Sequence, residues 1–403
     1  MLSDSNTLRR RAMTVVVAFG IVSLLGDVVY EGARSILGPY LGTLGASAAI
    51  VGLVSGVGDF TGSALRVATG WMADRTGGYW TMTFLGYGLT IVAVPFLGLV
   101  GRVDLVLALV VMERLGKAVR SPARDALLAE ASRPLGRGWG FGLHEALDQT
   151  GAVLGPLLAA AVLAWRAGDY RMAFLAVAVP GALVLPALLV ARRTLGAAPT
   201  PAAARPAAGD PRAGVPLQAR RYLAFVALTA AGLAPFPLIA FHAVRAPVLS
   251  EADVPLLFAA AMAVDAAAAL AVGRRYDRRG LAVLAALPLL SVAALAAFGR
   301  SAWLLWAGAV AWGAAMGIQE STLRAAVADL RGDTPPATAY GLFHTAYGLA
   351  LLAGGAALGA LYDWSTGALV GVVIGVQAAA WLVLRGLLTG GEGRPPPEES
   401  PPT

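Results

Sequence analysis

Residues 70–80 read GWMADRTGGYW, and a related stretch, GRRYDRRG, occupies residues 273–280. Three residue types recur between them at a displacement of 203 positions, with Gly70, Asp74 and Arg75 matched by Gly273, Asp277 and Arg278. A second set recurs at a displacement of 200 positions: Ser121, Arg124, Ala126, His144, Ala146 and Gly155 are matched by Ser321, Arg324, Ala326, His344, Ala346 and Gly355. Chance rarely aligns arginine, histidine, aspartate and glycine in this way, so the sequence predicts two related, parallel halves.

The composition of the chain is that of a membrane protein. Of the 403 residues, 58% are hydrophobic and only 14% are charged, and the mean hydropathy is +0.69. Soluble domains carry about 25% charged residues. Apolar stretches of about 20 residues, long enough to cross a hydrocarbon core about 30 Å thick, recur from end to end. We therefore predict an all-α integral membrane protein.

Apolar runs of this length predict about twelve transmembrane helices. The first six are expected at residues 12–40, 48–72, 80–100, 103–130, 138–165 and 170–192, and the others at 220–246, 254–275, 280–299, 302–330, 338–362 and 366–388. The repeat then predicts two pseudo-symmetric six-helix bundles, at residues 1–192 and 219–388. Residues 193–218 are rich in Pro, Ala and Gly and predict a flexible cytoplasmic linker, and residues 389–403 predict a disordered cytoplasmic tail.

The arginines between the predicted spans are unevenly divided between the two sides of the membrane. With a cytoplasmic N-terminus, the inner side holds Arg9, Arg10, Arg11, Arg75, Arg133, Arg137, Arg192, Arg193, Arg220, Arg221, Arg274, Arg275, Arg278, Arg279 and Arg331. The outer side holds only Arg102, Arg166, Arg171, Arg245 and Arg300. Basic loops stay cytoplasmic. We therefore expect a multi-pass protein of the cell (inner) membrane with both termini in the cytoplasm, and the net charge of +7 needs no nucleic-acid partner.

Several function classes are disfavoured by what the sequence lacks. There is no cysteine, and the three histidines lie far apart in the chain, so we expect neither a metal site nor a thiol nucleophile. No G-x-x-x-x-G-K-[ST] motif is present, and the single lysine, Lys117, lies inside a predicted span. We expect no enzyme activity, no cofactor and no ATP-driven step, but a monomer that handles protons and a small-molecule substrate in a cavity between its halves.

Charged residues in the first predicted span are the strongest candidates for function. A charge at the bilayer centre costs at least about 2.5 kcal/mol, so each one needs a partner, a cavity or a purpose. Asp27, Glu31 and Arg34 are spaced i, i+4 and i+7 on one helical face, with Tyr30 beside them. We expect Asp27 and Glu31 to carry protons, Arg34 to compete with the proton for Glu31, and Tyr30 and Arg34 to contact substrate. A structural ion triad is the alternative.

The fourth predicted span carries a second charged stripe. It consists of Glu113, Arg114, Lys117, Arg120, Arg124 and Asp125. The first three lie deeper and are candidate substrate contacts, although a structural role remains open for them. The last three lie near the cytoplasmic end, where we expect a gate network with Asp74. In the fifth span, Asp148 follows His144 and Glu145 by about one turn and is a third candidate proton carrier.

The second half holds fewer intramembrane charges. Glu320 and Arg324 are spaced i, i+4 and are interpreted as a structural pair, whereas Asp265 has no cation nearby in the sequence. Pro235 and Pro237 are expected to break the seventh span. The second half is therefore expected to supply a mostly apolar wall.

Several of these motifs resemble those of the major facilitator superfamily. Gly70, Asp74, Arg75 and Gly77 match the family signature in the first cytoplasmic loop, and Asp277 and Arg278 repeat it. In that family the loop helps to hold the outward-facing state, so the resemblance implies a gating role for these charged residues. Arg114 matches the arginine of the family's fourth helix, although Ala118 replaces an expected glycine.

The fifth span is similar to the family's antiporter signature, G-x8-G-x3-G-P. The matching residues are Gly142, Gly151, Gly155 and Pro156, whereas Ala159 and Ala160 replace preferred glycines. Small residues on one face allow close helix packing, and the proline bends the helix. The signature is associated with exporters.

Together these features predict a proton-coupled antiporter that exports a small organic, amphipathic compound by alternating access. One alternative is a proton-coupled symporter for an organic anion, with Arg34, Arg114 or Lys117 as ligands. Another is a divalent metal-ion exporter that uses Asp27, Glu31 and Asp148, because hard cations accept carboxylate oxygens. A transporter-like receptor would instead carry a large soluble domain or an ordered tail.

Overall fold

The computed structural model describes residues 2–135, 137–195, 216–246, 248–330 and 336–389, and every regular element in these ranges is helical. The first half consists of α1 (Leu2–Thr43), α2 (Ala48–Thr76), α3 (Tyr79–Leu97), α4 (Val103–Ala131), η1 (Arg133–Leu135), α5 (Arg137–Trp165), α6 (Tyr170–Ala178), η2 (Val179–Leu183) and α7 (Val184–Leu195). The second half consists of α8 (Leu217–Ala231), α9 (Phe236–Arg245), α10 (Asp253–Arg279), η3 (Gly280–Ala285), α11 (Ala286–Ala293), η4 (Ala294–Phe298), α12 (Ala302–Leu330), α13 (Pro336–Trp364) and α14 (Thr366–Thr389).

The predicted spans are confirmed once three interrupted helices are counted as single spans. These are α6–η2–α7, α8–α9 and η3–α11–η4. Eleven helices in the described ranges are long and apolar enough to cross a bilayer. The fourth span, α4, is outside that set because its charged stripe interrupts the apolar run. Most of the predicted linker and tail lies outside the described residues.

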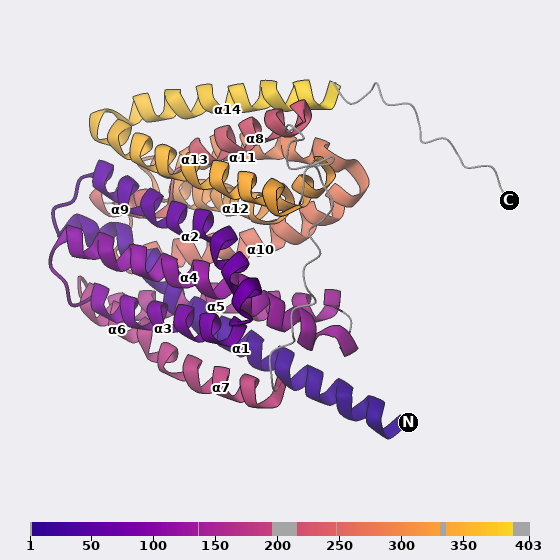
Figure 1. The fold of residues 1–403 in the computed structure, drawn as a ribbon. Coiled ribbons are helices and arrows are strands. Elements are labelled where there is room, and N and C mark those ends of the chain that lie inside the picture. The colour runs from indigo at the N-terminus through magenta and orange to yellow at the C-terminus, as the bar shows by residue number, and fades with distance from the viewer. Residues whose placement is uncertain (1, 136, 196–215, 247, 331–335, 390–403) are drawn as a thin grey trace.

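The two halves form two helical bundles that lie side by side (Figure 1). The N-terminus of α1 and the ends of α2, α7 and α10 that carry Arg75, Arg192, Arg193, Arg278 and Arg279 lie at one end of the molecule, here named the arginine-rich end. The opposite end, where α1 finishes and α2 begins, is named the arginine-poor end.

Glycines bring the two halves into backbone contact toward the arginine-poor end. A side chain on Gly52 of α2 would collide with the backbone of Gly355 in α13, and one on Gly359 would collide with Ala48. Gly38 of α1 lies in the same way against Pro237 of α9. Because every one of these contacts joins the first half to the second, the halves are sealed together at this end.

A carboxylate reinforces that seal. Asp363 of α13 accepts hydrogen bonds from the backbone N–H groups of Ala48 and Ala49, at 3.1 and 2.8 Å, in the first turn of α2. The free N–H groups and the dipole at a helix N-terminus favour a negative charge. Arg245 of α9 lies 3.8 Å from the same carboxylate. Asp363 therefore links a second-half helix to the start of a first-half helix.

The seventh span is broken where the prolines predict it. The chain leaves α8 after Ala231 and re-enters a helix at Phe236, with Pro235 as the residue before it. The backbone carbonyl of Ala234, freed by the break, accepts a 2.8 Å hydrogen bond from the indole of Trp312. The break is therefore satisfied internally, as the interior of a membrane protein requires.

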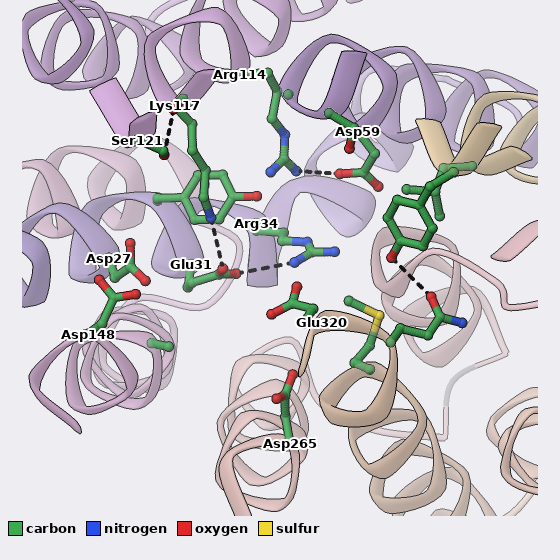
Figure 2. Close-up of a pocket in the computed structure, with 18 of the residues that line it drawn as sticks. Asp27, Glu31, Arg34, Asp59, Arg114, Lys117, Ser121, Asp148, Asp265 and Glu320 are labelled. Atoms are coloured by element: carbon green, nitrogen blue, oxygen red, sulfur yellow. Dashed lines mark hydrogen bonds and ion pairs between the residues drawn. The ribbon is translucent and has the colours of Figure 1, made fainter. Parts of the chain in front are cut away.

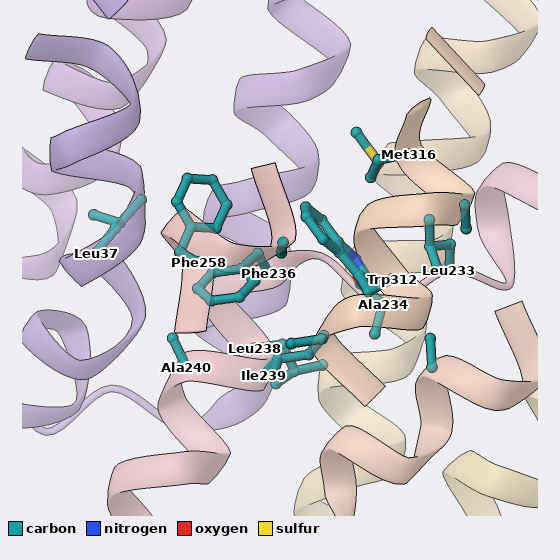
Figure 3. Packing of buried hydrophobic residues seen from close by; sticks show 14 of the residues in the cluster. Leu37, Leu233, Ala234, Phe236, Leu238, Ile239, Ala240, Phe258, Trp312 and Met316 are labelled. Carbon is teal, nitrogen blue, oxygen red and sulfur yellow. The ribbon is translucent and has the colours of Figure 1, made fainter. Parts of the chain in front are cut away.

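An aromatic cluster packs beside this break. The rings of Phe236, Phe258 and Trp312 lie with centroids 4.4, 5.4 and 6.1 Å apart (Figure 3). Trp312 packs in the interior and is 1% exposed, whereas Trp303 and Trp364 are 69% and 80% exposed.

Candidate functional site

A cavity of about 230 Å³ lies between the two halves. Side chains from α1, α2, α4 and α5 line one wall, and side chains from the α8–α9 break, α10, α12 and α13 line the other. At its deep end are Arg34, Met262 and Trp312, and toward the arginine-rich end are Arg66, Arg124 and Arg324. The second-half residues Glu320 and Arg324 are exposed within it. The cavity therefore extends from the midplane toward the arginine-rich end.

The lining is densely charged. The acidic side chains are Asp27, Glu31, Asp59, Asp125, Glu145, Asp148, Asp265 and Glu320. The basic side chains are Arg34, Arg66, Arg114, Lys117, Arg120, Arg124 and Arg324. So many charges at membrane depth are tolerated only where they pair with one another or face a water-filled space.

Glu31 lies between two cations from different helices (Figure 2). Its carboxylate is 3.5 Å from the guanidinium of Arg34, one turn along α1, and 4.0 Å from the ammonium of Lys117 on α4. Glu31 is only 6% exposed. The structure thus brings the predicted proton carrier together with two of the predicted substrate contacts.

Tyr30 is stacked against the cations of α4. The guanidinium carbon of Arg114 lies 4.5 Å from the centre of the Tyr30 ring, and the ammonium of Lys117 lies 3.8 Å from it. A ring face attracts cations in this range, by about 2 kcal/mol where water is excluded. Tyr30 therefore holds both cations at the cavity wall as well as lining the cavity itself.

Asp27 and Asp148 face each other from α1 and α5 (Figure 2). Asp27 is 7% exposed, and Arg120 lies 3.9 Å from it. One oxygen of Asp148 is buried with no hydrogen-bond partner among the described residues. Repulsion between two facing carboxylates is relieved when one of them binds a proton. Asp148 thus joins the first-span carboxylates in a single cluster.

Arg114 pairs with a residue that the sequence did not single out. Its guanidinium lies 3.3 Å from Asp59 of α2. Arg66, two turns further along the same helix, donates to the carbonyl of Gly62. Glu113 does not reach the central cavity: it lies in a side cavity of about 20 Å³, with its carboxylate 3.6 Å from Arg114. Arg114, the next residue of α4, thus lines the central cavity, and Glu113 does not.

The predicted gate network does not form in this arrangement. Arg120 donates to the hydroxyl of Thr90, and Arg124 donates to Asp125 and Ser23. All three of the predicted partners, Arg120, Arg124 and Asp125, line the cavity. In this structure Arg120 and Arg124 therefore contact side chains of α1, α3 and α4 itself.

The last turn of α2 makes local contacts instead. Asp74 is exposed and accepts a 2.9 Å hydrogen bond from the hydroxyl of Tyr79, and Arg75 is stacked on Trp71. Arg278, its counterpart in the repeat, is exposed at the end of α10, and the Asp277 side chain lies outside the described residues. The gating role of these residues remains a prediction.

Two of the four residues of the predicted packing motif lie at a helix crossing. Side chains on Gly151 and Gly155 would collide with the carbonyls of Leu24 and Val28, so α5 crosses α1 in backbone contact beside the Asp27–Asp148 cluster. Gly142, by contrast, has open space where a side chain would stand. Pro156 lies within α5. Gly70 packs against Pro122 of α4, with 3.3 Å to the position of an added Cβ.

The second half contributes more polar side chains to the cavity than the sequence indicated. Asp265 of α10, Glu320 and Arg324 of α12, and His344 and Tyr347 of α13 all line it. Arg324 donates to the backbone carbonyl of Glu320, not to its carboxylate, so the predicted side-chain pair is not formed. Their isolated positions in an apolar sequence were the signal that could have marked them as cavity residues.

Comparison with known proteins identifies the family. Residues 19–248, more than half of the chain, match the sequence profile of the Major Facilitator Superfamily. The chain belongs to this superfamily. It is therefore a multi-pass membrane transporter, and the predicted membership of this superfamily is confirmed.

Relatives and solved structures agree with the family but leave the substrate open. An uncharacterised protein of Mycobacterium tuberculosis strain H37Rv is 46% identical over 378 residues, which cover 93% of this chain and 92% of that protein. An uncharacterised transporter of the superfamily from Methanocaldococcus jannaschii is 30% identical over 187 residues, 46% of each chain.

Similar folds occur in two solved transporters. The nucleoside transporter NupG has a TM-score of 0.74 at 12% identity, covering 93% of this chain and 99% of its own. A bacterial homologue of the lysosomal transporter Spinster, in an inward-facing unoccupied conformation, has a TM-score of 0.69 at 18% identity, covering 94% and 98%. At these identities the likeness shows the shared fold alone.

Proposed function

We propose that this transporter is a proton-coupled antiporter that exports a small organic compound by alternating access. The observation that carries the proposal is a cluster of carboxylates, the buried Asp27 and Glu31 with the half-buried Asp148, in a cavity between two halves that are sealed at one end. A group that gives up and takes up protons must change its exposure between the two sides of the membrane, and a cavity between rocking halves provides that change.

Proton binding has a direct mechanical consequence at Glu31. While it is ionised, Glu31 attracts Arg34 along α1 and Lys117 on α4, and so ties these two helices together. A protonated Glu31 loses the charge that holds both cations. Arg34 and Lys117 then become available to other partners, and the contact between α1 and α4 loosens. Proton occupancy is thereby coupled to the packing of the first half.

The orientation assigns the two ends of the molecule to the two sides of the membrane. Basic loops remain in the cytoplasm, so the arginine-rich end is assigned to the cytoplasm and the arginine-poor end to the outside. In this state the cavity then opens inward, where an exported compound would be loaded. Release to the outside requires the glycine contacts at the arginine-poor end, together with the Asp363 link, to separate.

The test is transport by the full chain in proteoliposomes with an imposed pH gradient. A chemically diverse panel of radiolabelled organic compounds is offered, and an enclosed pH dye reports proton movement. We expect compound export to accompany proton entry, and Asp27→Asn or Glu31→Gln to reduce gradient-driven transport at least tenfold. Substrate counterflow without a gradient should persist in these variants, because it needs binding and rocking but no net proton transfer.

A matched control separates coupling from a general loss of charge. Asp104 is an exposed carboxylate at the start of α4 that pairs with Arg102 at 2.7 Å, outside the cavity. Asp104→Asn should transport at the wild-type rate. Full gradient-driven transport in both Asp27→Asn and Glu31→Gln would overturn the proposal. Proton entry together with uptake of an anion would favour the symporter.

A further inference from the structure

The second-half wall of the cavity has two acidic side chains that form no ion pair with any described cation. They are Asp265 of α10 and Glu320 of α12, both on the second-half wall, which the sequence suggested was mostly apolar. Within the described part of the chain neither carboxylate takes part in an ion pair or a side-chain hydrogen bond. Asp265 is 3% exposed, yet its carboxylate points into the cavity (Figure 2). A buried carboxylate without a partner is costly, so Asp265 needs either a proton or a positively charged ligand.

Five of the six first-half cations that line the cavity are already paired with acids of the same half. The pairs are Arg34 with Glu31, Lys117 with Glu31, Arg114 with Asp59, Arg120 with Asp27, and Arg124 with Asp125. Arg66 and Arg324 have no carboxylate partner, but both donate to backbone carbonyls and lie toward the arginine-rich end. Among the described residues, the cavity carboxylates without an ion pair are therefore Asp265 and Glu320 of the second half and Glu145 and Asp148 of α5. Of the latter two, Glu145 accepts a hydrogen bond from Gln149, and Asp148 faces Asp27 (Figure 2).

The two free carboxylates are held in a fixed relation by the packing of their helices. A side chain on Gly317 would collide with the backbone carbonyl of Asp265 itself, and one on Gly313 would collide with Ala261. Glu320 follows Gly317 by one turn of α12. The backbones of α10 and α12 are therefore in contact beside both carboxylates, which makes the pair a built feature of the wall.

The neighbouring side chains suit an organic cation better than a metal ion. Trp312 and Tyr347 line the same cavity, and so do the thioethers of Met262 and Met316. Aromatic faces attract ammonium groups, and thioethers adapt to varied apolar shapes. A hard divalent cation would instead require several oxygen ligands arranged around it.

We propose that the second-half wall is a subsite for a protonated amine, in which Asp265 and Glu320 bind the ammonium group of a small organic substrate. The organic part of the substrate packs against Trp312, Tyr347 and the two methionines. Proton transfer is left to the carboxylates of the first half. This inference rests on the proposed transport function, and it names the chemical class of the substrate.

The test uses three probes of nearly equal size: benzylammonium, benzyl alcohol and benzoate. Binding to the purified full chain in nanodiscs is measured by calorimetry at neutral pH and low salt. We expect benzylammonium to bind at least tenfold more tightly than the other two. Asp265→Asn and Glu320→Gln should each weaken benzylammonium binding at least tenfold and leave the affinity for benzyl alcohol unchanged.

The control variant is Glu145→Gln, which removes another exposed cavity carboxylate, on α5 of the opposite wall. It should change benzylammonium affinity less than threefold. Tetraethylammonium and spermidine extend the panel to larger cations, so that a subsite that binds benzylammonium weakly because of its size is still detected. The proposal is overturned if none of the three cations binds better than benzyl alcohol, or if Asp265→Asn and Glu320→Gln both leave cation affinity intact.

The outcome also separates this inference from the proposed function. Cation binding that depends on Asp265, without any proton-driven transport of the bound cation, would leave the subsite standing and remove the antiport mechanism. Proton-driven export limited to neutral or anionic compounds would support the antiport mechanism and remove the ammonium subsite.

Discussion

The two halves share a fold but use equivalent helices for different purposes. At a displacement of 200 positions, α4 and α12 align so that Glu113, Arg114, Lys117, Arg120 and Arg124 correspond to Gly313, Ala314, Gly317, Glu320 and Arg324. Ser121 and Ser321 keep the same position and the same hydrogen bond, each to the carbonyl four residues earlier. The backbone geometry of the repeat is therefore conserved between the halves while the chemistry of the stripe is not.

This difference changes the kind of contact that holds the helices of each half together. In α4, long cations reach across to α1 and α2 and tie these helices together through ion pairs. In α12, glycines stand where α4 has Glu113 and Lys117, and α10 comes into backbone contact. The first half is thus held partly by charges that a proton can alter, whereas α10 and α12 are held by close packing that a proton does not affect.

The largest effect is expected from the glycine contact of the second half. Gly317→Leu places a side chain against the backbone of Asp265 in α10, and backbone cannot yield as a flexible side chain can. Overpacking costs about 1–3 kcal/mol and more where the helices must separate. We expect loss of monodisperse protein, measured by size-exclusion chromatography in detergent.

The control for this substitution lies in the same pair of helices. Gly273 of α10 has open space where its side chain would stand, so Gly273→Leu should give the wild-type yield. Equal yields from the two variants would show that α10 and α12 do not depend on close packing, and the contrast between the halves would fail.

The next largest effect is expected at Arg120, and we compare the stability lost on substituting it with that lost at its counterpart in the repeat, Glu320. Arg120 is 2% exposed, lies 3.9 Å from Asp27 and is stacked on Tyr87. Removing one partner of a buried pair costs about 3–5 kcal/mol, because the other charge stays buried. Arg120→Met should lower the free energy of unfolding by that amount, whereas the accessible and unpaired Glu320 should tolerate Glu320→Gln within about 1 kcal/mol.

A second substitution distinguishes charge from packing at this site. If the loss in Arg120→Met comes from the orphaned carboxylate, adding Asp27→Asn should restore part of the stability. An additive double variant would mean that Arg120 acts by filling space. Denaturant-induced unfolding, followed by tryptophan fluorescence, measures the wild type, Arg120→Met, Asp27→Asn, their double variant and Glu320→Gln.

Much of the fold could be predicted from the sequence because it depends on local patterns. Apolar runs of transmembrane length and a repeat displacement near 200 were enough to predict twelve spans in two bundles. Pro235 and Pro237 were enough to predict the broken seventh span, since proline removes a backbone donor wherever it occurs. These signals need no knowledge of which helices touch.

The pairing of charges was less predictable because it depends on contacts between helices. Helical spacing placed Asp27, Glu31 and Arg34 on one face, and that face does line the cavity. Spacing could not show that Arg114 meets Asp59, or that Asp74 contacts Tyr79. The same limit made the second half look apolar, because isolated carboxylates in different spans give no periodic pattern.

A smaller effect is expected at the arginine-poor end, where the halves are joined by Asp363. Asp363→Asn removes the charge that two backbone N–H groups of α2 and Arg245 share. Hydrogen bonds to charged groups contribute about 1.5–3 kcal/mol. We expect the fraction of molecules that are open at this end to rise at least tenfold. Asp104→Asn, which alters an ion pair within the first half, should leave this fraction unchanged.

The chain's lack of cysteine makes this fraction measurable without background labelling. A reporter, Met316→Cys, lies in the cavity wall and reacts with a membrane-impermeant maleimide added from the arginine-poor side only when that end opens. An unchanged labelling rate in Asp363→Asn would show that the glycine contacts alone keep the halves sealed.

The smallest effect concerns the one cation of α1 that reaches the aromatic cluster of the second half. The guanidinium of Arg34 lies 5.8 and 5.9 Å from the rings of Phe258 and Trp312. Arg34→Lys keeps the charge but replaces a planar group that stacks well with a compact, strongly hydrated one. The loss should be about 0.5–2 kcal/mol, seen as faster labelling of the Met316→Cys reporter. Arg192→Lys, whose guanidinium lies 6.0 Å from Phe84 within the first half, should leave that rate unchanged. If both variants accelerate labelling equally, Arg34 does not connect the halves, and their separation depends on backbone contacts alone.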